Sequence, residues 1–192
     1  DNGATWYGAE VYNNDSGGAL WSWGFNWKGQ LGQNQASGPG GVKISSPIQI
    51  PGTWKNVYSN MYDQYNGVVG READGTLWGW GGSNRGIFVY NTGGYYGYSS
   101  PVQMAGTDWS SNIGLTGVKF IGSKTDGTLW VTGSGEYGDN GQNNTTYYSS
   151  PVQIPGTTWK TSAGCVVADA KVKSCLAIKT DGTLWSWGRN LY

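Results

Sequence analysis

The chain has 192 residues, among them 34 glycines, 12 tryptophans and 13 tyrosines, and its 12 basic residues balance its 12 acidic residues. A net charge of zero creates no field that would attract nucleic acid or an anionic membrane, and no apolar run reaches the roughly 20 residues of a membrane-spanning helix. The chain contains no histidine, the commonest general base, and this composition favours short strands and tight turns over a catalytic domain.

In chain order, the first clear strand is expected at residues 19–23, where Leu20-Trp21 is followed by Trp23. A polar loop follows, and the stretch Ser-Ser-Pro-Ile-Gln-Ile-Pro-Gly at residues 45–52 closes the unit. Proline at the start of a strand and just past its end is typical of an edge strand, where a missing N–H costs nothing. We therefore expect residues 45–50 to form the outer strand of the first unit.

The sequence Asp-Gly-Thr-Leu-Trp occurs three times further along, at residues 74–78, 126–130 and 181–185. Asp-Gly between β-prone runs is a strong hairpin signal, because glycine tolerates the positive φ of a tight turn. The Leu-Trp pairs begin at residues 20, 77, 129 and 184, so the spacings are 57, 52 and 55 residues. A period of this size indicates repeats, which we assign to units 1–53, 54–108, 109–158 and 159–192.

The motifs follow one order: Trp-Lys, then Ala-Ile-Lys-Thr-Asp-Gly-Thr-Leu-Trp-Ser-Trp-Gly, Asn-x-x-Gly-Gln-Leu-Gly and Ser-Pro-x-Gln-Ile-Pro-Gly, although Gln-Leu-Gly at residues 30–32 is replaced in the later units. Across residues 19–188 this order resembles the repeats of the regulator of chromosome condensation (RCC1-like) propeller family. The resemblance implies an all-β propeller, usually of seven blades. The family's Gly-x-x-His has no counterpart, since the chain has no histidine.

We therefore expect about four four-stranded units, or 3.5 complete blades, forming part of a seven-bladed ring; a closed four-bladed ring is the competing geometry. Leu77, Leu129 and Leu184 should be equivalent, with nearly all tryptophans of the Leu-Trp-x-Trp motif buried. The fourth unit lacks its Ser-Pro-x-Gln-Ile strand. We expect that the chain continues beyond residue 192, or that a second copy or neighbouring subunit covers the open ends of the propeller.

No catalytic, cofactor or metal site is predicted. Asp74, Asp126 and Asp181 occupy hairpin turns, where their side chains serve a local conformational role. The loop at residues 139–144 is rich in oxygen atoms, but it lacks the alternating carboxylates of a dedicated calcium loop.

Two cysteines, Cys165 and Cys175, lie in one enlarged part of the fourth unit. The stretch from the opening tryptophan to the turn aspartate is 22 residues there (159 to 181), against 20 (54 to 74) and 17 (109 to 126) in the units before it. We expect a disulfide across the base of the insertion. Two buried, reduced thiols are the alternative.

Tyrosine and asparagine gather in the loops that lead into the outer strands of successive units, which should place them on the same rim of the propeller. Tyrosine offers a large contact area at a low entropic cost, a property of many recognition surfaces for proteins or glycans. Tyrosines packed on the blade edges, with only the hydroxyl in water, are the alternative. The candidate ligand-binding residues are Tyr90, Tyr95, Tyr96, Tyr98, Asn143, Asn144, Tyr147 and Tyr148.

These observations lead us to expect a non-catalytic binding or scaffold module with a protein or glycan ligand, and without nucleic acid or membrane insertion. Its low charge and many aromatic residues favour an extracellular or particle-surface protein, such as a bacterial surface protein or a phage fibre or decoration protein. The alternative implied by the resemblance is an intracellular regulator that acts on a small GTPase or on chromatin. A propeller-based glycan-active enzyme is a second alternative.

Overall fold

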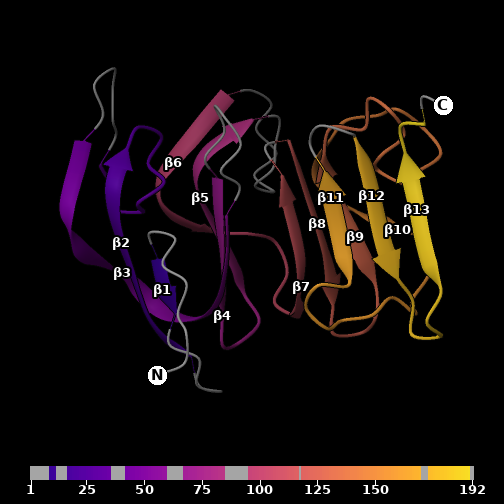
Figure 1. The fold of residues 1–192 in the computed structure, drawn as a ribbon, viewed down its shortest axis with the longest axis horizontal. Helices are drawn as coiled ribbons and strands as arrows, with labels where there is room; N and C mark the ends of the chain where they lie inside the picture. The colour runs from indigo at the N-terminus through magenta and orange to yellow at the C-terminus, as the bar shows by residue number, and fades with distance from the viewer. Residues whose placement is uncertain are drawn as a thin grey trace.

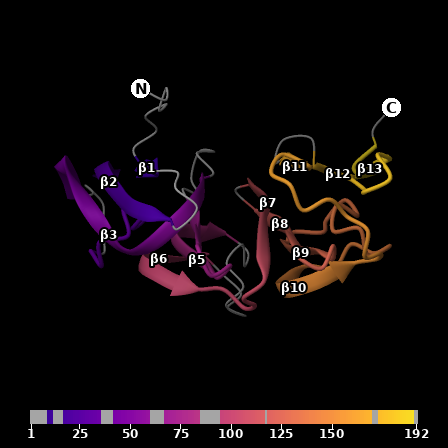
Figure 2. The ribbon, with the colours of Figure 1, turned by 90° about the horizontal axis from the view of Figure 1, so that it is seen from below.

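The computed structural model describes residues 9–11, 17–35, 42–59, 67–84, 95–116, 118–169 and 173–190. Within these ranges every regular element is a β-strand, and the strands form three antiparallel sheets. The sheets follow one another along the chain and around an arc that is open on one side (Figures 1 and 2). No part of the described chain forms a helix with the length and apolar character needed to cross a membrane.

The first sheet has six strands in sequence order and spans two of the predicted units. Its strands are β1 (Ala9–Val11), β2 (Gly18–Asn26), β3 (Val42–Ser59), β4 (Gly67–Glu72), β5 (Leu77–Asn84) and β6 (Tyr95–Gln103). The long strand β3 joins the two halves, because its residues up to Ile50 pair with β2, Trp54 pairs with both β2 and β4, and residues 56–59 pair with β4. The expected outer strand of the first unit is therefore continuous with the first strand of the second unit.

The second sheet has four strands and the third has three. The second contains β7 (Trp109–Thr116), β8 (Lys119–Lys124), β9 (Leu129–Gly133) and β10 (Tyr148–Ile154), and the third contains β11 (Val166–Asp169), β12 (Ser174–Ile178) and β13 (Leu184–Gly188). Strand β7 makes close approaches to β3, β4 and β11, so it lies between the flanking sheets. The outer strands β6 and β10 lie along the convex margin of the arc (Figure 2).

The buried apolar side chains of the described residues gather in three clusters. Leu20, Ile50, Trp54 and Trp80 form the first cluster, and their packing includes an edge-to-face contact with 5.4 Å between the ring centroids of Trp54 and Trp80. The other two clusters lie on either side of the second sheet, one containing Val69, Leu77, Met104, Trp109, Ile113 and Phe120, the other Ile121, Leu129, Val131, Ile154, Trp159, Val166, Cys175 and Ala177. Both of these clusters combine residues of the second sheet with residues of the sheet beside it or of the connecting segment. The burial of these apolar side chains therefore depends on the packing of one sheet against the next.

The Asp-Gly-Thr turns form where the sequence predicts hairpins. In the second unit, the Glu72 amide donates to the Thr76 carbonyl oxygen at 3.0 Å, and the Gly75 amide donates to the Glu72 carbonyl oxygen at 3.1 Å. Gly75 has a φ of +86°, a conformation that glycine adopts without a steric penalty. This is a three-residue hairpin loop, in which the aspartate precedes the glycine that takes the left-handed conformation.

The expectation that nearly all tryptophans of the Leu-Trp-x-Trp motif are buried is wrong, because only Trp80 is buried, Trp21 is 37% exposed and the tryptophans at 23, 78, 130 and 187 are half-buried. Leu77 and Leu129 are fully buried, whereas Leu184 is 64% exposed and Trp185 is 49% exposed. Ile154 of β10 lies opposite Leu129 and is itself buried, but no described strand pairs with the outer edge of β13. Leu184 is exposed because it lacks the outer strand that covers its counterparts.

The expected disulfide is not formed, and both cysteines are free. Cys175 lies opposite Ala168 in the pairing of β11 with β12, whereas the Cys165 carbonyl oxygen accepts a hydrogen bond from the Ile178 amide. The two cysteines are therefore offset by three residues along the ladder, or about 10 Å at the rise of a strand. A disulfide needs a Cα separation of roughly 4.4–6.8 Å, so the paired strands of the insertion keep the two thiols apart.

Candidate binding surfaces

Tyr98 and Tyr148 occupy equivalent positions on the outer strands. Tyr98 of β6 lies opposite Gly81 of β5, and Tyr148 of β10 lies opposite Gly133 of β9, where each glycine ends the Leu-Trp motif of its unit. Both tyrosines are half-buried. The repeat therefore brings this pair of candidate residues to the same margin of successive sheets.

Hydrogen bonds order the loop before β10. The Asn144 Nδ2 atom donates to the Tyr148 hydroxyl oxygen at 3.1 Å and to the Gln142 carbonyl oxygen at 3.2 Å. The Thr146 amide donates to the Asn144 Oδ1 atom at 2.8 Å. Asn143 and Asn144 are exposed, and Asn143 has a φ of +54°. This loop presents amide groups and one tyrosine edge to solvent in a fixed arrangement.

The other candidate tyrosines differ in how they are placed. Tyr98 packs against the core cluster around Leu77, which matches the alternative of a tyrosine packed on a blade edge, and Tyr147 is also half-buried. Tyr95 and Tyr96 belong to β6, where they pair with Asn84 and Ser83. Tyr90 lies outside the described residues.

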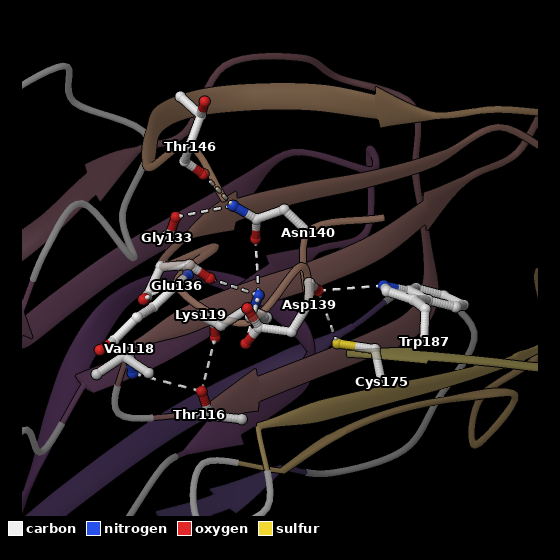
Figure 3. A network of polar contacts seen from close by, with 11 residues as sticks. Thr116, Val118, Lys119, Gly133, Glu136, Asp139, Asn140, Thr146, Cys175 and Trp187 are labelled. Atoms are coloured by element: carbon white, nitrogen blue, oxygen red, sulfur yellow. Dashed lines mark hydrogen bonds and ion pairs between the residues drawn. The ribbon is translucent and has the colours of Figure 1, made fainter. Parts of the chain in front are cut away.

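A buried ion pair, which was not predicted from the sequence, lies in the third unit (Figure 3). The Lys119 Nζ atom is 3.0 Å from the Asp139 Oδ2 atom, and the side chains of the two residues are only 3% and 2% exposed. The same ammonium donates to the Asn140 Oδ1 atom at 2.7 Å and to the Ser134 carbonyl oxygen at 2.6 Å. Burial lowers the pKa of Lys119, while the charge and the hydrogen bond of the Asp139 carboxylate act in the opposite direction.

This network connects the second and third sheets. The Asp139 carbonyl oxygen accepts hydrogen bonds from the Cys175 thiol at 3.3 Å and from the Trp187 indole at 3.1 Å, as Figure 3 shows. Burial raises the pKa of Cys175 to about 12, so the thiol stays protonated near neutral pH. Since its charged groups are enclosed and its thiol is protonated, we assign the network a structural role.

One sequence signal could have pointed to this pair. Lys119 lies seven residues before the turn aspartate Asp126, and Gly67 and Ser174 stand at the same distance from the turn aspartates of the second and fourth units. A lysine at a strand position where the other repeats have small residues indicates a partner specific to that unit. The oxygen-rich loop at residues 139–144 supplies this partner, Asp139, and its carboxylate binds an ammonium group.

A cavity of about 400 Å³ lies between the first and second units. It is lined by the loop at residues 32–34, by Pro51 and Trp54 of β3, by Glu72 and Trp78 of the second hairpin, and by Ser100 and Pro101 of β6. Hydrogen bonds hold the loop against β6: the Asn34 amide donates to the Ser99 carbonyl oxygen at 2.7 Å, and the Ser100 hydroxyl donates to the Asn34 Oδ1 atom at 3.2 Å. The mouth of the cavity is therefore built from segments far apart in the sequence.

In the third unit, a lysine fills the position that corresponds to Glu72 in this cavity. Lys124 pairs with Trp109 in the ladder, as Glu72 pairs with Trp54. The Lys124 ammonium lies 5.5 Å from the ring centroid of Trp109 and 5.3 Å from that of Trp130. The same ammonium lies 2.9 Å from the Asp108 Oδ1 atom, so an ion pair and two cation–π contacts together hold the positive charge here.

The fourth unit repeats this arrangement. Lys179 pairs with Trp159 in an isolated antiparallel β-bridge of the backbone. Its ammonium lies 5.0 Å from the ring centroid of Trp159 and 4.1 Å from that of Trp185. A lysine between two tryptophans is therefore a feature of the repeat. Only the second of these three hairpins has a carboxylate at that position.

Within the described ranges, no three histidine, cysteine, aspartate or glutamate side chains gather in a way that could hold a metal ion. Asp74, Asp126 and Asp181 serve as turn residues, because each Oδ1 atom accepts hydrogen bonds from the amide and the hydroxyl of the threonine two residues later. These three carboxylates are thus engaged in local hydrogen bonds of their own turns.

No protein-family model matches the chain, and no curated protein matches it. Among solved structures, the chain is similar to human WBSCR16, with 21% identity and a TM-score of 0.67 over 95% of this chain and 46% of that protein. It is also similar to yeast RCC1 (Prp20) bound to Kap60, with 18% identity and a TM-score of 0.68 over 96% of this chain and 45% of that protein.

A second structure of Prp20p from Saccharomyces cerevisiae, described together with its binding to Gsp1p and histones, matches with 17% identity and a TM-score of 0.67 over 95% of this chain and 42% of that protein. The chain thus spans less than half the length of these neighbours. They are nuclear or mitochondrial proteins, so the expectation of an extracellular or particle-surface location is corrected. At these identities the likeness concerns the fold, and the chain has the fold of a partial RCC1-like β-propeller.

Proposed function

We propose that the chain is a non-catalytic binding module that recognises protein partners through the outer margin of its propeller. The observation that carries this proposal is the loop before β10, where the exposed Asn144 amide bonds to the Tyr148 hydroxyl at the strand position that Tyr98 occupies in the preceding unit. Repeat proteins use such in-register positions to build extended binding surfaces. Tyrosine and asparagine also suit a recognition surface, because they combine contact area with adaptable hydrogen bonding.

Protein partners are preferred over glycans because of the structural neighbours. Prp20 is described in complex with Kap60 and in relation to Gsp1p and histones, all of which are proteins. The same likeness favours a second candidate function, a regulator of a small GTPase or of chromatin. This second function predicts that the chain changes the rate of nucleotide release from a small GTPase.

The proposal can be tested with variants of the margin. Two double variants are informative: Tyr148→Ala with Asn144→Ala, and Tyr95→Ala with Tyr96→Ala. Each should lower the affinity for an identified protein partner about tenfold or more, as removal of central aromatic contacts commonly does. The melting temperature should stay close to that of the wild type. Affinities would be measured by calorimetry or surface plasmon resonance.

Thr145→Ala, a change at another exposed position of the same loop, serves as the matched control and should leave the affinity unchanged. A glycan array is the second arm of the test. A partner that binds all the margin variants with wild-type affinity would contradict the proposed surface, and specific glycan binding without protein binding would contradict the choice of ligand class.

We also propose that the exposed outer edge of β13 is covered in the functional protein by an outer strand from a second copy or a neighbouring subunit. Leu184 and Trp185 are exposed beside a strand edge that pairs with no strand in the described part of the chain. Such an edge promotes association with another strand. The residues opposite Leu129 and Trp130 in the third unit, Ile154 and Gln153, indicate the kind of strand that fits.

A further inference from the structure

The cavity between the first and second units is lined by two tryptophans and a glutamate, groups that attract cations, and its lining residues include no lysine or arginine. Strand register identifies the equivalent positions, since Glu72, Lys124 and Lys179 lie opposite Trp54, Trp109 and Trp159, respectively. A second tryptophan completes each site. Trp78, Trp130 and Trp185 correspond, because each indole donates to the threonine hydroxyl two residues before it.

In the third and fourth units, the chain's own ammonium group occupies the space against the two indoles. All four distances between these lysine Nζ atoms and tryptophan ring centroids lie between 4.1 and 5.5 Å. Cations within about 6 Å of an indole centroid are attracted by the ring quadrupole. The two indoles therefore attract positive charge at this point of the hairpin in both units, and in the third unit the Asp108 carboxylate, 2.9 Å from the Lys124 Nζ atom, adds to this attraction.

The second unit has the same two tryptophans but a negatively charged residue at the lysine position. Trp54 and Trp78 are retained, and Glu72 places a carboxylate where the lysines stand in the other units. The Glu72 carboxylate lies beside the hairpin, with its Oε2 atom 3.3 Å from the Thr76 hydroxyl oxygen, whose single proton makes the shorter hydrogen bond to the Asp74 Oδ1 atom at 2.7 Å. The cavity of about 400 Å³ beside these residues lies within the size range of small-ligand sites.

We propose that this cavity binds an alkylammonium group, which supplies from outside the positive charge that Lys124 and Lys179 supply from within. Trp78, which is half-buried, offers its ring to the cation, and Glu72 neutralises the charge. The amide side chains at residues 33 and 34 and the rings of Pro51 and Pro101 enclose the rest of the group. The ligand is either a lysine or methyl-lysine side chain of another protein or a trimethylammonium headgroup. This inference does not depend on the outer margin of the propeller.

The test follows the indole N–H signals of the folded chain by NMR during titration with n-butylammonium and with choline. Trp78 is assigned from its missing signal in Trp78→Phe. We expect a saturable shift of the Trp78 signal with either cation, and no such shift with n-butanol, with the neutral carbon isostere of choline, or with sodium chloride at equal concentration. Tighter binding of n-butylammonium would identify a lysine-type source, and tighter binding of choline would identify a trimethylammonium source.

Two variants at Glu72 complete the test. Glu72→Gln should lower the affinity for both cations by about tenfold, because it removes the negative charge of the side chain while keeping its shape. Glu72→Lys should abolish the titration while the chain remains folded, since the new ammonium takes the place that Lys124 and Lys179 take in their units. Glu136→Lys makes the same charge change at an exposed position outside the cavity and should leave binding unchanged. Equal shifts with the neutral isosteres, or unaltered binding by Glu72→Lys, would overturn the proposal.

Discussion

The Asp-Gly-Thr turn of each hairpin combines three local interactions. In the third unit, the Asp126 Oδ1 atom accepts from the Thr128 amide at 2.9 Å and from its hydroxyl at 2.6 Å, while that hydroxyl accepts from the Trp130 indole at 2.8 Å. The hydrogen bonds from Thr128 lower the pKa of the Asp126 carboxyl. The threonine hydroxyl thus links the turn to the first tryptophan of the motif.

Thr128→Val should lower the free energy of unfolding by about 1–2 kcal/mol at neutral pH, because it removes one partner of Asp126 and leaves the Trp130 indole without its acceptor. A lowered carboxyl pKa stabilises the fold above the unfolded value of about 3.9, and this contribution is lost as pH falls through the folded pKa. The difference from the wild type should therefore shrink in acid. Denaturant unfolding at neutral pH and near pH 3 measures both effects.

Thr183→Val is the matched control, because the equivalent turn in the fourth unit makes the same hydrogen bonds while exposed to water. Its effect should be smaller, since water replaces lost hydrogen bonds at an exposed site. Equal losses at the two turns would contradict the role assigned to burial.

At the scale of elements, equivalent hydrogen bonds from a tryptophan indole to a backbone carbonyl join neighbouring units at two places. The Trp80 indole of the second unit donates to the Gln30 carbonyl oxygen of the first at 3.0 Å, and the Trp187 indole of the fourth donates to the Asp139 carbonyl oxygen of the third at 3.1 Å. Each acceptor lies six residues after the glycine that ends the Leu-Trp motif of its own unit. At the second place, Lys119 adds a buried ion pair to the loop that carries the acceptor.

Lys119→Met should destabilise the chain by about 3–5 kcal/mol, because it leaves the Asp139 carboxylate buried without a counter-charge. The double variant Lys119→Met with Asp139→Asn should recover much of this loss, since no net charge is then buried. Chemical denaturation of the wild type, both single variants and the double variant measures the coupling. Additive losses would show that the two side chains act independently.

At the scale of the whole molecule, the three sheets form an arc whose final strand, β13, has no described partner on its outer edge (Figure 2). Every earlier leucine of the Leu-Trp motif is covered, since Leu20, Leu77 and Leu129 are fully buried. Their covering residues, Ile50, Met104 and Ile154, belong to the outer strand of the same unit or directly follow it. The stability of the last unit should therefore depend on what covers Leu184.

A peptide with the sequence of residues 149–154, Ser-Ser-Pro-Val-Gln-Ile, should bind the edge of β13 and raise the melting temperature in a concentration-dependent way. In the third unit these residues place isoleucine opposite leucine, and the same register would cover Leu184. A scrambled peptide should have no effect, and Leu184→Lys should abolish the shift. A chain that neither binds the peptide nor self-associates in sedimentation experiments would contradict an open edge that requires cover.

The sequence by itself determined the hairpins, the repeat and the outer strands, because these features depend on residues within a few positions of one another. Asp126, Gly127 and Thr128 set a turn through their own backbone preferences and hydrogen bonds, whatever packs against them. The sequence did not reveal the Lys119–Asp139 pair or the cavity beside Glu72, and it suggested a disulfide that the strand register prevents. These features were decided by the tertiary structure, because burial, charge pairing and cavity shape depend on which distant strands and loops are packed together.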